Sequence, residues 1–161
     1  MAAFSIRFAV ECDLPVLLGL INDLAAYERL SHDVSATEDR LRTALFGARP
    51  AAEAVISEFD GRPVGFAVFF QNFSTFLGQP GLYLEDLFVK PEWRGRGFGT
   101  QLLVRLAQIA VDRGYGRMEW SVLDWNEPAL RVYRRIGAQA MDEWTVHRLT
   151  GEALRRLASG A

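Results

Sequence analysis

The sequence is poor in the residues that build redox and metal centres. It has one cysteine, Cys12, so no disulfide can form within the chain, and such scarcity is typical of a reducing compartment. Its two histidines, His32 and His147, are far apart in sequence and neither lies near Cys12, so the spacing typical of a zinc site is missing. We therefore expect no metal.

Long apolar runs and an excess of basic charge are also missing. No stretch reaches the roughly 18 apolar residues that span a bilayer, and the N-terminal residues lack a signal-peptide pattern. The 18 Lys and Arg residues are outnumbered by 20 Asp and Glu residues, whereas non-specific nucleic-acid binding usually requires a basic excess. These absences predict a cytoplasmic protein with neither membrane nor nucleic acid as a partner.

What is present is the composition of an ordinary globular protein. Half of the 161 residues are hydrophobic and 24% are charged. A chain of this length is close to the usual size of one domain. It buries enough surface to form a stable core without disulfide bonds or bound metal ions. We expect a single domain over residues 1–161.

Apolar spacing and turn residues predict the element order β-α-α-β-β-β-α-β-α-β, followed by a short amphipathic helix. Strands are expected at residues 4–9, 54–59, 63–70, 81–90, 118–123 and 140–149. Helices are expected at residues 13–29, 35–47, 102–114 and 128–136, with a last one ending near 157. Hairpins in the first half and strand–helix–strand crossovers in the second imply an α/β fold, a mixed sheet with helices on both faces.

Two local patterns fix parts of this prediction. Residues 35–38 read Ser-Ala-Thr-Glu, a capping-box pattern that opens the second helix at Ser35. The pair Asp60-Gly61 separates two strand-like runs and is a strong hairpin signal.

The most informative segment is residues 94–100, Arg-Gly-Arg-Gly-Phe-Gly-Thr, between a predicted strand and a predicted helix. Glycines allow a tight turn, and the unpaired amides at a helix N-terminus form an anion site to which Arg94 and Arg96 add charge. Thr100 stands where a dinucleotide fingerprint needs its third glycine, and the Gly-Lys-Ser/Thr of a P-loop is missing. The alternative is a turn that merely connects strand to helix; the interleaved arginines argue against it.

This segment resembles the R-x-x-G-x-G/A motif of the Gcn5-related N-acetyltransferase (GNAT) superfamily, and the element order is similar along nearly the whole chain. Residues 83–89 (YLEDLFV), 124–128 (DWNEP) and 133–138 (YRRIGA) resemble the diamine and thialysine acetyltransferase group in particular. The resemblance implies a GNAT-like fold with a splayed parallel strand pair, and a single acetyltransferase domain.

The resemblance also implies acetyl-CoA as the co-substrate. The main chain of Leu87, Phe88 and Val89 would pair with its pantetheine arm, and Asn126 would contact the pantetheine near the thioester. For Asn126 the other interpretation is a helix N-cap, and both roles are compatible. The expected cofactor-binding set is completed by Arg94, Gly95, Arg96, Gly97, Phe98, Gly99 and Thr100 at the pyrophosphate, and by Pro128 and Ala129.

Two catalytic residues follow from the same resemblance. Tyr133 matches the family tyrosine that protonates the departing thiolate, and a phenol with an ordinary pKa near 10 retains its proton at pH 7. A core aromatic is the alternative, because Val132 and Ile136 flank it. Glu85 would attract the substrate ammonium and help to remove its proton through water; a solvated carboxylate is the alternative. Strand alternation predicts that Glu85 and Asp86 point to opposite faces.

We expect the acceptor to be a primary amine of a small molecule, bound by Tyr27, Glu28, Glu85, Asp86, Glu143 and Trp144. Family members complete this site with a second subunit, so a homodimer is implied. By the resemblance, this amine belongs to a lysine analogue such as thialysine, or to a diamine or polyamine. Residues 72–78 lack the acidic residue of polyamine-acetylating members, which favours an amino acid or short diamine. The alternatives are acetylation of a peptide or protein N-terminus or lysine, and a non-catalytic acyl-CoA-binding module.

Overall fold

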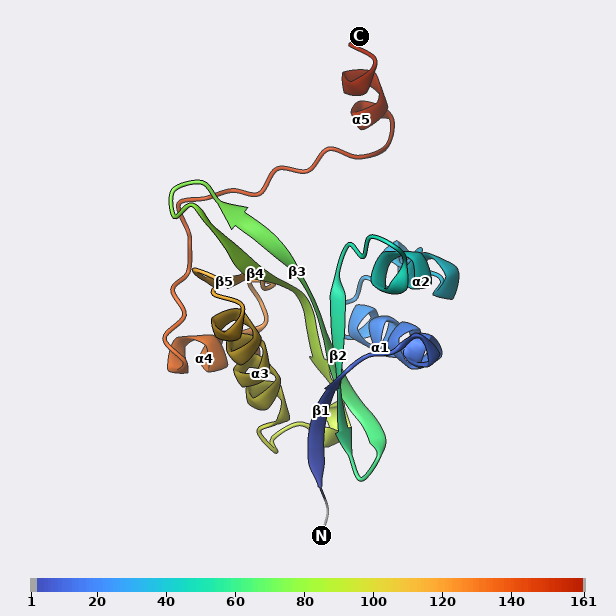
Figure 1. Ribbon diagram of the computed structural model, residues 1–161, viewed down its shortest axis with the longest axis vertical. Coiled ribbons are helices and arrows are strands. Elements are labelled where there is room, and N and C mark those ends of the chain that lie inside the picture. Colours follow the sequence, from blue (N-terminus) through green and yellow to red (C-terminus); the bar gives the residue numbers. More distant parts are fainter. Residues whose placement is uncertain (1–2, 161) are drawn as a thin grey trace. The chain divides into compact units, whose positions relative to one another are not determined.

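Five strands form one mixed sheet within the described residues, 3–160, of the computed structural model (Figure 1). The strands are β1 (Phe4–Phe8), β2 (Glu53–Phe59), β3 (Arg62–Ser74), β4 (Gln79–Val89) and β5 (Met118–Trp120). They are hydrogen-bonded in the order β1-β2-β3-β4-β5, and each pairing is antiparallel except that of β4 with β5, which is parallel. The predicted α/β class with a mixed sheet is confirmed.

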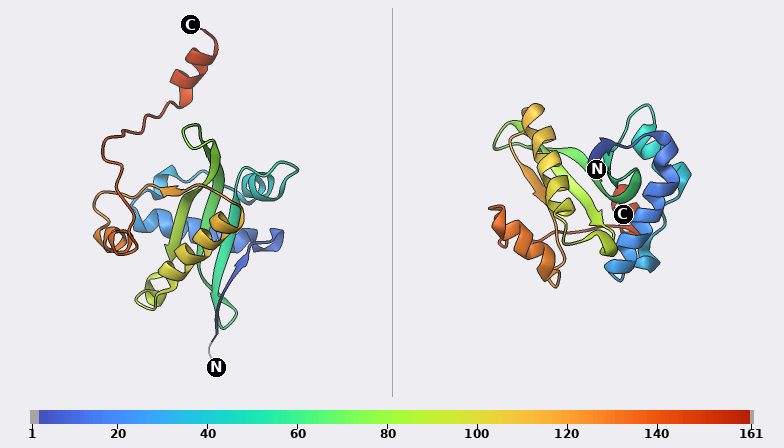
Figure 2. Two further views of the ribbon diagram at one scale, coloured as in Figure 1. Left: turned by 60° about the vertical axis from the view of Figure 1, so that its left-hand side comes forward. Right: turned by 90° about the horizontal axis from the view of Figure 1, so that it is seen from below.

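The chain divides into two compact units after Ser121. The first contains the sheet together with α1 (Leu14–Tyr27), α2 (Glu38–Phe46) and α3 (Phe98–Asp112). In this unit α1 and α2 cover one face of the sheet and α3 lies on the other (Figures 1 and 2). The second unit contains α4 (Glu127–Arg135) and α5 (Gly151–Ala158). The single domain over residues 1–161 stays a prediction.

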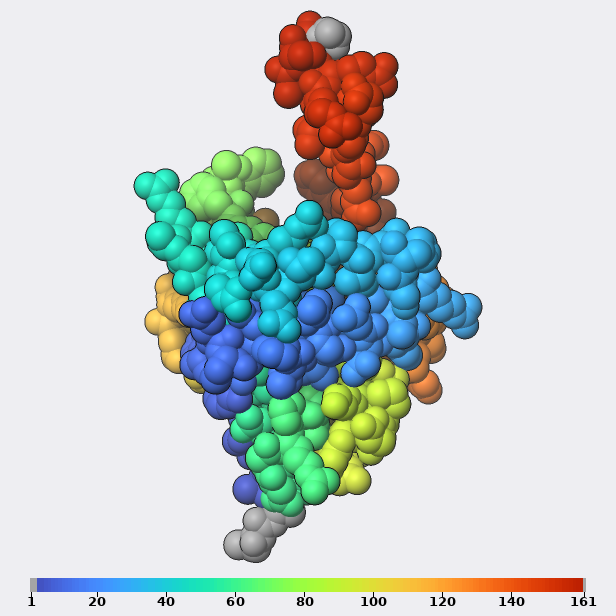
Figure 3. Space-filling view, turned by 90° about the vertical axis from the view of Figure 1, so that its right-hand side faces the viewer, coloured from blue at the N-terminus to red at the C-terminus, as the bar shows by residue number. Residues whose placement is uncertain are grey.

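The core of the first unit follows the predicted periodicities. On α1, Leu17, Leu20 and Leu24 are buried, and they pack with Phe66 of β3 and Phe88 of β4 in one cluster. On α3, the buried face is formed by the residues whose spacing predicted the helix: Leu102, Leu103, Leu106, Ile109 and Ala110. Figure 3 shows the outer surface of the layer that α1 and α2 form over the sheet. Burial of these apolar faces, each side chain contributing about 1.5–3 kcal/mol, stabilises the three layers.

The hairpin predicted at Asp60-Gly61 joins β2 to β3. Both residues have positive φ, 50° and 73°, and Phe59 pairs with Arg62 directly across the turn. A two-residue turn with this twist matches the twist of the flanking strands.

Three local predictions are wrong. The cap of α2 is Thr37, whose hydroxyl accepts a hydrogen bond from the Arg40 amide at 3.2 Å, so the cap lies two residues after Ser35 and the helix begins at Glu38. The strand predicted over residues 118–123 ends at Trp120. Residues 140–149 form no strand: a turn joins the Trp144 amide to the Met141 carbonyl, and the large apolar residues do not alternate regularly.

No helix within the described residues is long and apolar enough to cross a membrane. The expected cytoplasmic location stays a prediction.

Candidate active site

The parallel strands β4 and β5 pair only over a short distance. Their partners are Leu82 with Met118, Tyr83 with Glu119 and Leu84 with Trp120, and within the described chain no later residue of β4 pairs with β5. Because β4 continues to Val89, the main chain of residues 85–89 has one edge that β5 does not cover. This edge offers N–H and C=O groups to an extended ligand, in the manner of an added strand.

A hydrogen bond between side chains marks the point where the two strands part. The Tyr83 hydroxyl lies 3.0 Å from the Ser121 hydroxyl, one residue beyond β5. Sequence reasoning missed this pair, because the contact depends on the register of the parallel strands and has no local signal.

A β-bulge interrupts β4 at Glu85. Val68 of β3 lies opposite Asp86, whereas the next residue, Phe69, lies opposite Leu84, so Glu85 is an extra residue in β4. A bulge bends the strand and re-aims its side chains. Strict alternation therefore does not apply here, and the sequence-based argument for opposite faces loses its basis at Glu85 and Asp86. The Glu85 side chain is exposed and that of Asp86 is partly buried.

Three carboxyl groups meet beside this bulge. Burial is the main cause that raises the pKa of Asp86 to about 6, and the negative charges of Glu85 and then Glu28 contribute to the same rise. Burial also raises the pKa of Glu28, which caps the C-terminus of α1 beside Tyr27. The structure thus brings together four of the six predicted substrate-binding residues. A cationic amine would relieve the repulsion among these carboxylates.

The glycine-rich loop leads from the end of β4 into α3. Gly95 and Gly97 have φ values of 76° and 80°, in the left-handed region that only glycine adopts readily, and Gly97 is the N-cap of α3. The first amide of the helix with a main-chain partner is that of Gln101, bonded to the Gly97 carbonyl at 3.0 Å. Across the described residues, the amides of residues 95–100 donate to no main-chain or side-chain acceptor.

Such a row of unpaired amides at the positive end of a helix dipole is an anion site. At Gly99 a Cβ would meet Val89 and Leu87 side-chain atoms at 3.9 and 4.0 Å, which are ordinary contact distances, so this position lies beside the end of β4 without being crowded. The ring of Phe98 stacks on Phe4 with centroids 4.2 Å apart, so Phe98 has only its main chain to offer a ligand.

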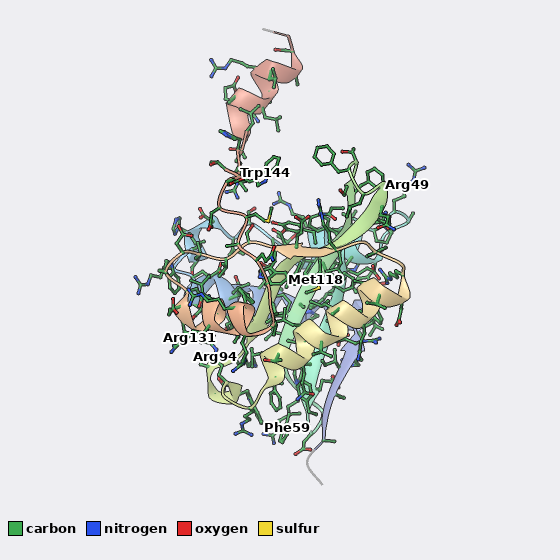
Figure 4. All side chains as sticks on the ribbon, turned by 90° about the vertical axis from the view of Figure 1, so that its left-hand side faces the viewer. Arg49, Phe59, Arg94, Met118, Arg131 and Trp144 are labelled. Atoms are coloured by element: carbon green, nitrogen blue, oxygen red, sulfur yellow. The ribbon has the colours of Figure 1, made fainter. Side chains whose placement is uncertain are left out.

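The two arginines of the loop lie against aromatic rings. The Arg94 guanidinium lies 4.3 Å from the centre of the Tyr27 ring, and its Nε donates to the Val89 carbonyl at 2.9 Å. The Arg96 guanidinium lies 4.7 Å from the centre of the Trp93 ring. Figure 4 labels Arg94 on the loop between β4 and α3. Sequence reasoning missed the contact of Arg94 with Tyr27.

The remaining predicted residues belong to the second unit. Asn126 is the N-cap of α4 and accepts a hydrogen bond from the Ala129 amide at 3.4 Å, with Pro128 in the first turn. The helix N-cap interpretation of Asn126 is therefore confirmed. Tyr133 lies on α4 and is partly buried.

Glu143 and Trp144 lie on the exposed segment between α4 and α5, where Figure 4 labels Trp144. Among the described residues no group of three His, Cys, Asp or Glu side chains is placed to hold a metal ion, and Cys12 is exposed.

Comparison with known proteins agrees with this geometry. The profile of the acetyltransferase (GNAT) family matches residues 20–138. The thialysine N-epsilon-acetyltransferase of Bos taurus is 38% identical over 169 residues, which cover 98% of this chain and 99% of that protein. An L-ornithine N5-acetyltransferase of Arabidopsis thaliana is 34% identical, over 94% of this chain and 86% of the relative. A solved integron cassette protein from the mobile metagenome of V. cholerae has a TM-score of 0.80 at 28% identity, covering 96% of this chain and 97% of its own.

Proposed function

The chain belongs to the acetyltransferase (GNAT) family and is an acetyl-CoA-dependent N-acetyltransferase, and from this premise we propose that it acetylates the primary amine of a lysine analogue or short diamine. The observation that carries the proposal is the combination of unpaired amides at residues 95–100 with three carboxyl groups beside the uncovered edge of β4. The amides suit the diphosphate of coenzyme A, and the carboxyl groups suit a cationic amine.

The donor would bind to the first of these parts. The amides of residues 95–100 would hold the pyrophosphate, with charge from Arg96, and the main chain of residues 87–89 would pair with the pantetheine arm. Asn126, Pro128 and Ala129, at the start of α4, would contribute the contacts near the thioester. The Asn126 side-chain oxygen accepts from the Ala129 amide, which fixes the start of α4.

The reaction would be a direct transfer. The neutral amine attacks the thioester carbonyl carbon, a tetrahedral intermediate forms, and its collapse breaks the carbon–sulfur bond and expels the thiolate. Tyr133 would protonate that sulfur as a general acid. Before the attack, the bound ammonium would lose one proton to Glu85 through water, because the exposed carboxylate has access to solvent. The proton that the nitrogen loses after the attack would pass through solvent and restore the Tyr133 phenol.

The carboxyl groups support an acceptor that carries at least one positive charge. Glu28, Glu85 and Asp86 lie close enough to influence one pKa, and they occupy a compact region rather than a long track. A long polycation would favour carboxylates spread along its length, whereas a short amine needs fewer. The names of the relatives, a thialysine and an ornithine acetyltransferase, support the same class of acceptor.

A homodimer is part of the proposal. In the first unit Phe76, at the tip of the β3–β4 hairpin, is 98% exposed, and in the second unit Trp144 and Val146 are 75% and 82% exposed. Large apolar side chains that are exposed in a single chain can be buried in a subunit interface. Light scattering should give twice the mass of the 18.1 kDa chain; a monomer at assay concentration would refute this part.

A thiol-release assay with acetyl-CoA and a panel of amines tests the function. The panel should hold thialysine, ornithine, lysine, short diamines, spermidine and peptides with a free N-terminus or lysine. We expect the highest kcat/KM with the short diamino compounds. Turnover confined to peptides would support the peptide acetyltransferase instead, and coenzyme A binding without turnover on any amine would support a binding module.

A further inference from the structure

The contacts of Arg94 are with residues that precede the glycine-rich loop. Its main-chain amide donates to the Pro91 carbonyl at 3.2 Å, which closes the 3-10 turn after β4. Its Nε donates to the Val89 carbonyl at 2.9 Å, so the side chain folds back toward the last residue of β4. The main chain and side chain of Arg94 are thus both hydrogen-bonded to residues at or just after the end of β4, Pro91 and Val89.

The guanidinium also covers the C-terminus of α1. Its central carbon lies 4.3 Å from the centre of the Tyr27 ring and 5.4 Å from that of Phe88, and these two rings are 6.5 Å apart. Tyr27 is the last residue of α1 and packs on the core cluster that contains Leu24 and Phe88. A planar cation over an aromatic face is a favourable contact, and arginine combines it with a directed hydrogen bond, which lysine does not reproduce.

The C-terminus of α1 ends in a tight reversal of the chain. The helix stops because Arg29 adopts a positive φ of 62°, and the Leu30 amide bonds back to the Ala25 carbonyl at 2.8 Å. Glu28, whose charge contributes to the raised pKa of Asp86, lies between Tyr27 and this reversal. A small rotation of the helix end would therefore move the Glu28 carboxyl group relative to that of Asp86.

We propose that Arg94 is a positioning residue for the acceptor amine: by clamping Tyr27 to the end of β4, it sets where Glu28 lies relative to the bulge at Glu85. This replaces the expected role of Arg94 as a ligand of the pyrophosphate, which falls to the amides of residues 95–100. The inference rests on the proposed function, because the acceptor site is part of it.

The proposal predicts that substitution of Arg94 affects amine binding and not coenzyme A binding. A pyrophosphate ligand at this position would give the opposite result. Arg94→Lys and Arg94→Gln should raise the KM for the amine about 10-fold or more at saturating acetyl-CoA. The same variants should leave the dissociation constant of coenzyme A, measured by calorimetry without amine, within about 3-fold of the parent. Arg94→Lys keeps the charge but loses the planar group, so charge alone should not rescue amine binding.

The matched control is Arg105→Lys. The Arg105 guanidinium also lies over an aromatic ring, 5.8 Å from the centre of Phe8, but on α3 and outside the proposed donor and acceptor residues. It should change neither constant. Thermal unfolding of all variants shows whether a loss reflects global destabilisation.

A double-mutant cycle completes the test. If Arg94 acts through Tyr27, adding Arg94→Gln to Tyr27→Leu should raise the amine KM by less than 3-fold beyond Tyr27→Leu alone. A rise of 10-fold or more in the coenzyme A dissociation constant with an unchanged amine KM would overturn the proposal, as would fully multiplicative effects in the cycle. Failure of the proposed function is a separate result, since the unsubstituted chain would then turn over no small amine.

Discussion

The negative charge of Glu28, at the end of α1, raises the pKa of Asp86 in β4, although the two residues lie in distant parts of the sequence. Burial is the main reason that the pKa of Asp86 rises to about 6, and the carboxylates of Glu85 and then Glu28 add to it. Near neutral pH the partly buried carboxylates of Asp86 and Glu28 carry negative charge that is incompletely solvated. The sheet and α1 therefore form a site in which a bound cation would reduce the repulsion between carboxylates.

Replacing Asp86 with asparagine should stabilise the fold at pH 8. The pKa of Asp86 is higher in the folded than in the unfolded chain, so ionisation between pH 3.8 and about 6 costs stability as the pH rises. Asp86→Asn should recover at most about 3 kcal/mol above pH 6 and nothing below pH 4. Urea unfolding at pH 4, 6 and 8 measures this. Asp23→Asn on the exposed side of α1 is the control, and an equal gain there would contradict the explanation.

Amine binding should weaken as the pH falls through about 6, because Asp86 then takes up a proton and loses its charge. A diamine analogue with permanently charged trimethylammonium groups isolates this effect, since its own charge does not titrate. Its inhibition constant should rise on acidification in the parent chain and stay nearly flat in Asp86→Asn. The same pH dependence in both proteins would mean that another group controls binding.

Tyr133→Phe should lower kcat about 10²–10⁴-fold, because the departing thiolate then has no phenolic proton to accept. The affinity for acetyl-CoA should stay within about 2-fold, since the ring remains on α4. Single-turnover kinetics with the best amine, together with calorimetry, separate the two quantities. A Phe variant with unimpaired turnover would remove Tyr133 from the mechanism.

Gly97→Ala should impair both stability and donor binding. A Cβ at Gly97 would meet open space, but a φ of 80° costs an alanine about 1–2 kcal/mol, and relaxation of the turn would redirect the amides of the loop. We expect the affinity for coenzyme A to fall about 10-fold. Gly19→Ala, at an exposed helical position of α1 with equal space, should stabilise the chain by about 0.5–1 kcal/mol and leave coenzyme A binding unchanged.

The sequence predicted the parts of the fold that local patterns determine. The hairpin at Asp60-Gly61 and the buried faces of α1 and α3 follow from turn chemistry and apolar spacing. The bulge at Glu85 depends on which β3 residues lie opposite, so no pattern within β4 indicates it. For the same reason the convergence of Glu28 with Asp86 was expected only from family resemblance.

Prediction failed where two local signals competed or where a segment lacks a partner. Ser35 and Thr37 both precede the second helix, and the structure uses Thr37 as the cap. Residues 140–149 contain strand-forming residues, but backbone pairing from a neighbouring strand is needed to make a strand, and none of the described residues supplies it.

The amides of residues 95–100 offer the most direct test of donor binding, because they have no acceptor among the described residues. In ¹⁵N–¹H correlation spectra recorded during a titration with coenzyme A, these amides should show the largest shifts and become protected from exchange. Gly61 and Gly114 also have positive φ but lie outside the loop, and their amide resonances should not shift. Absence of binding, or shifts that leave residues 95–100 unaffected, would contradict the account.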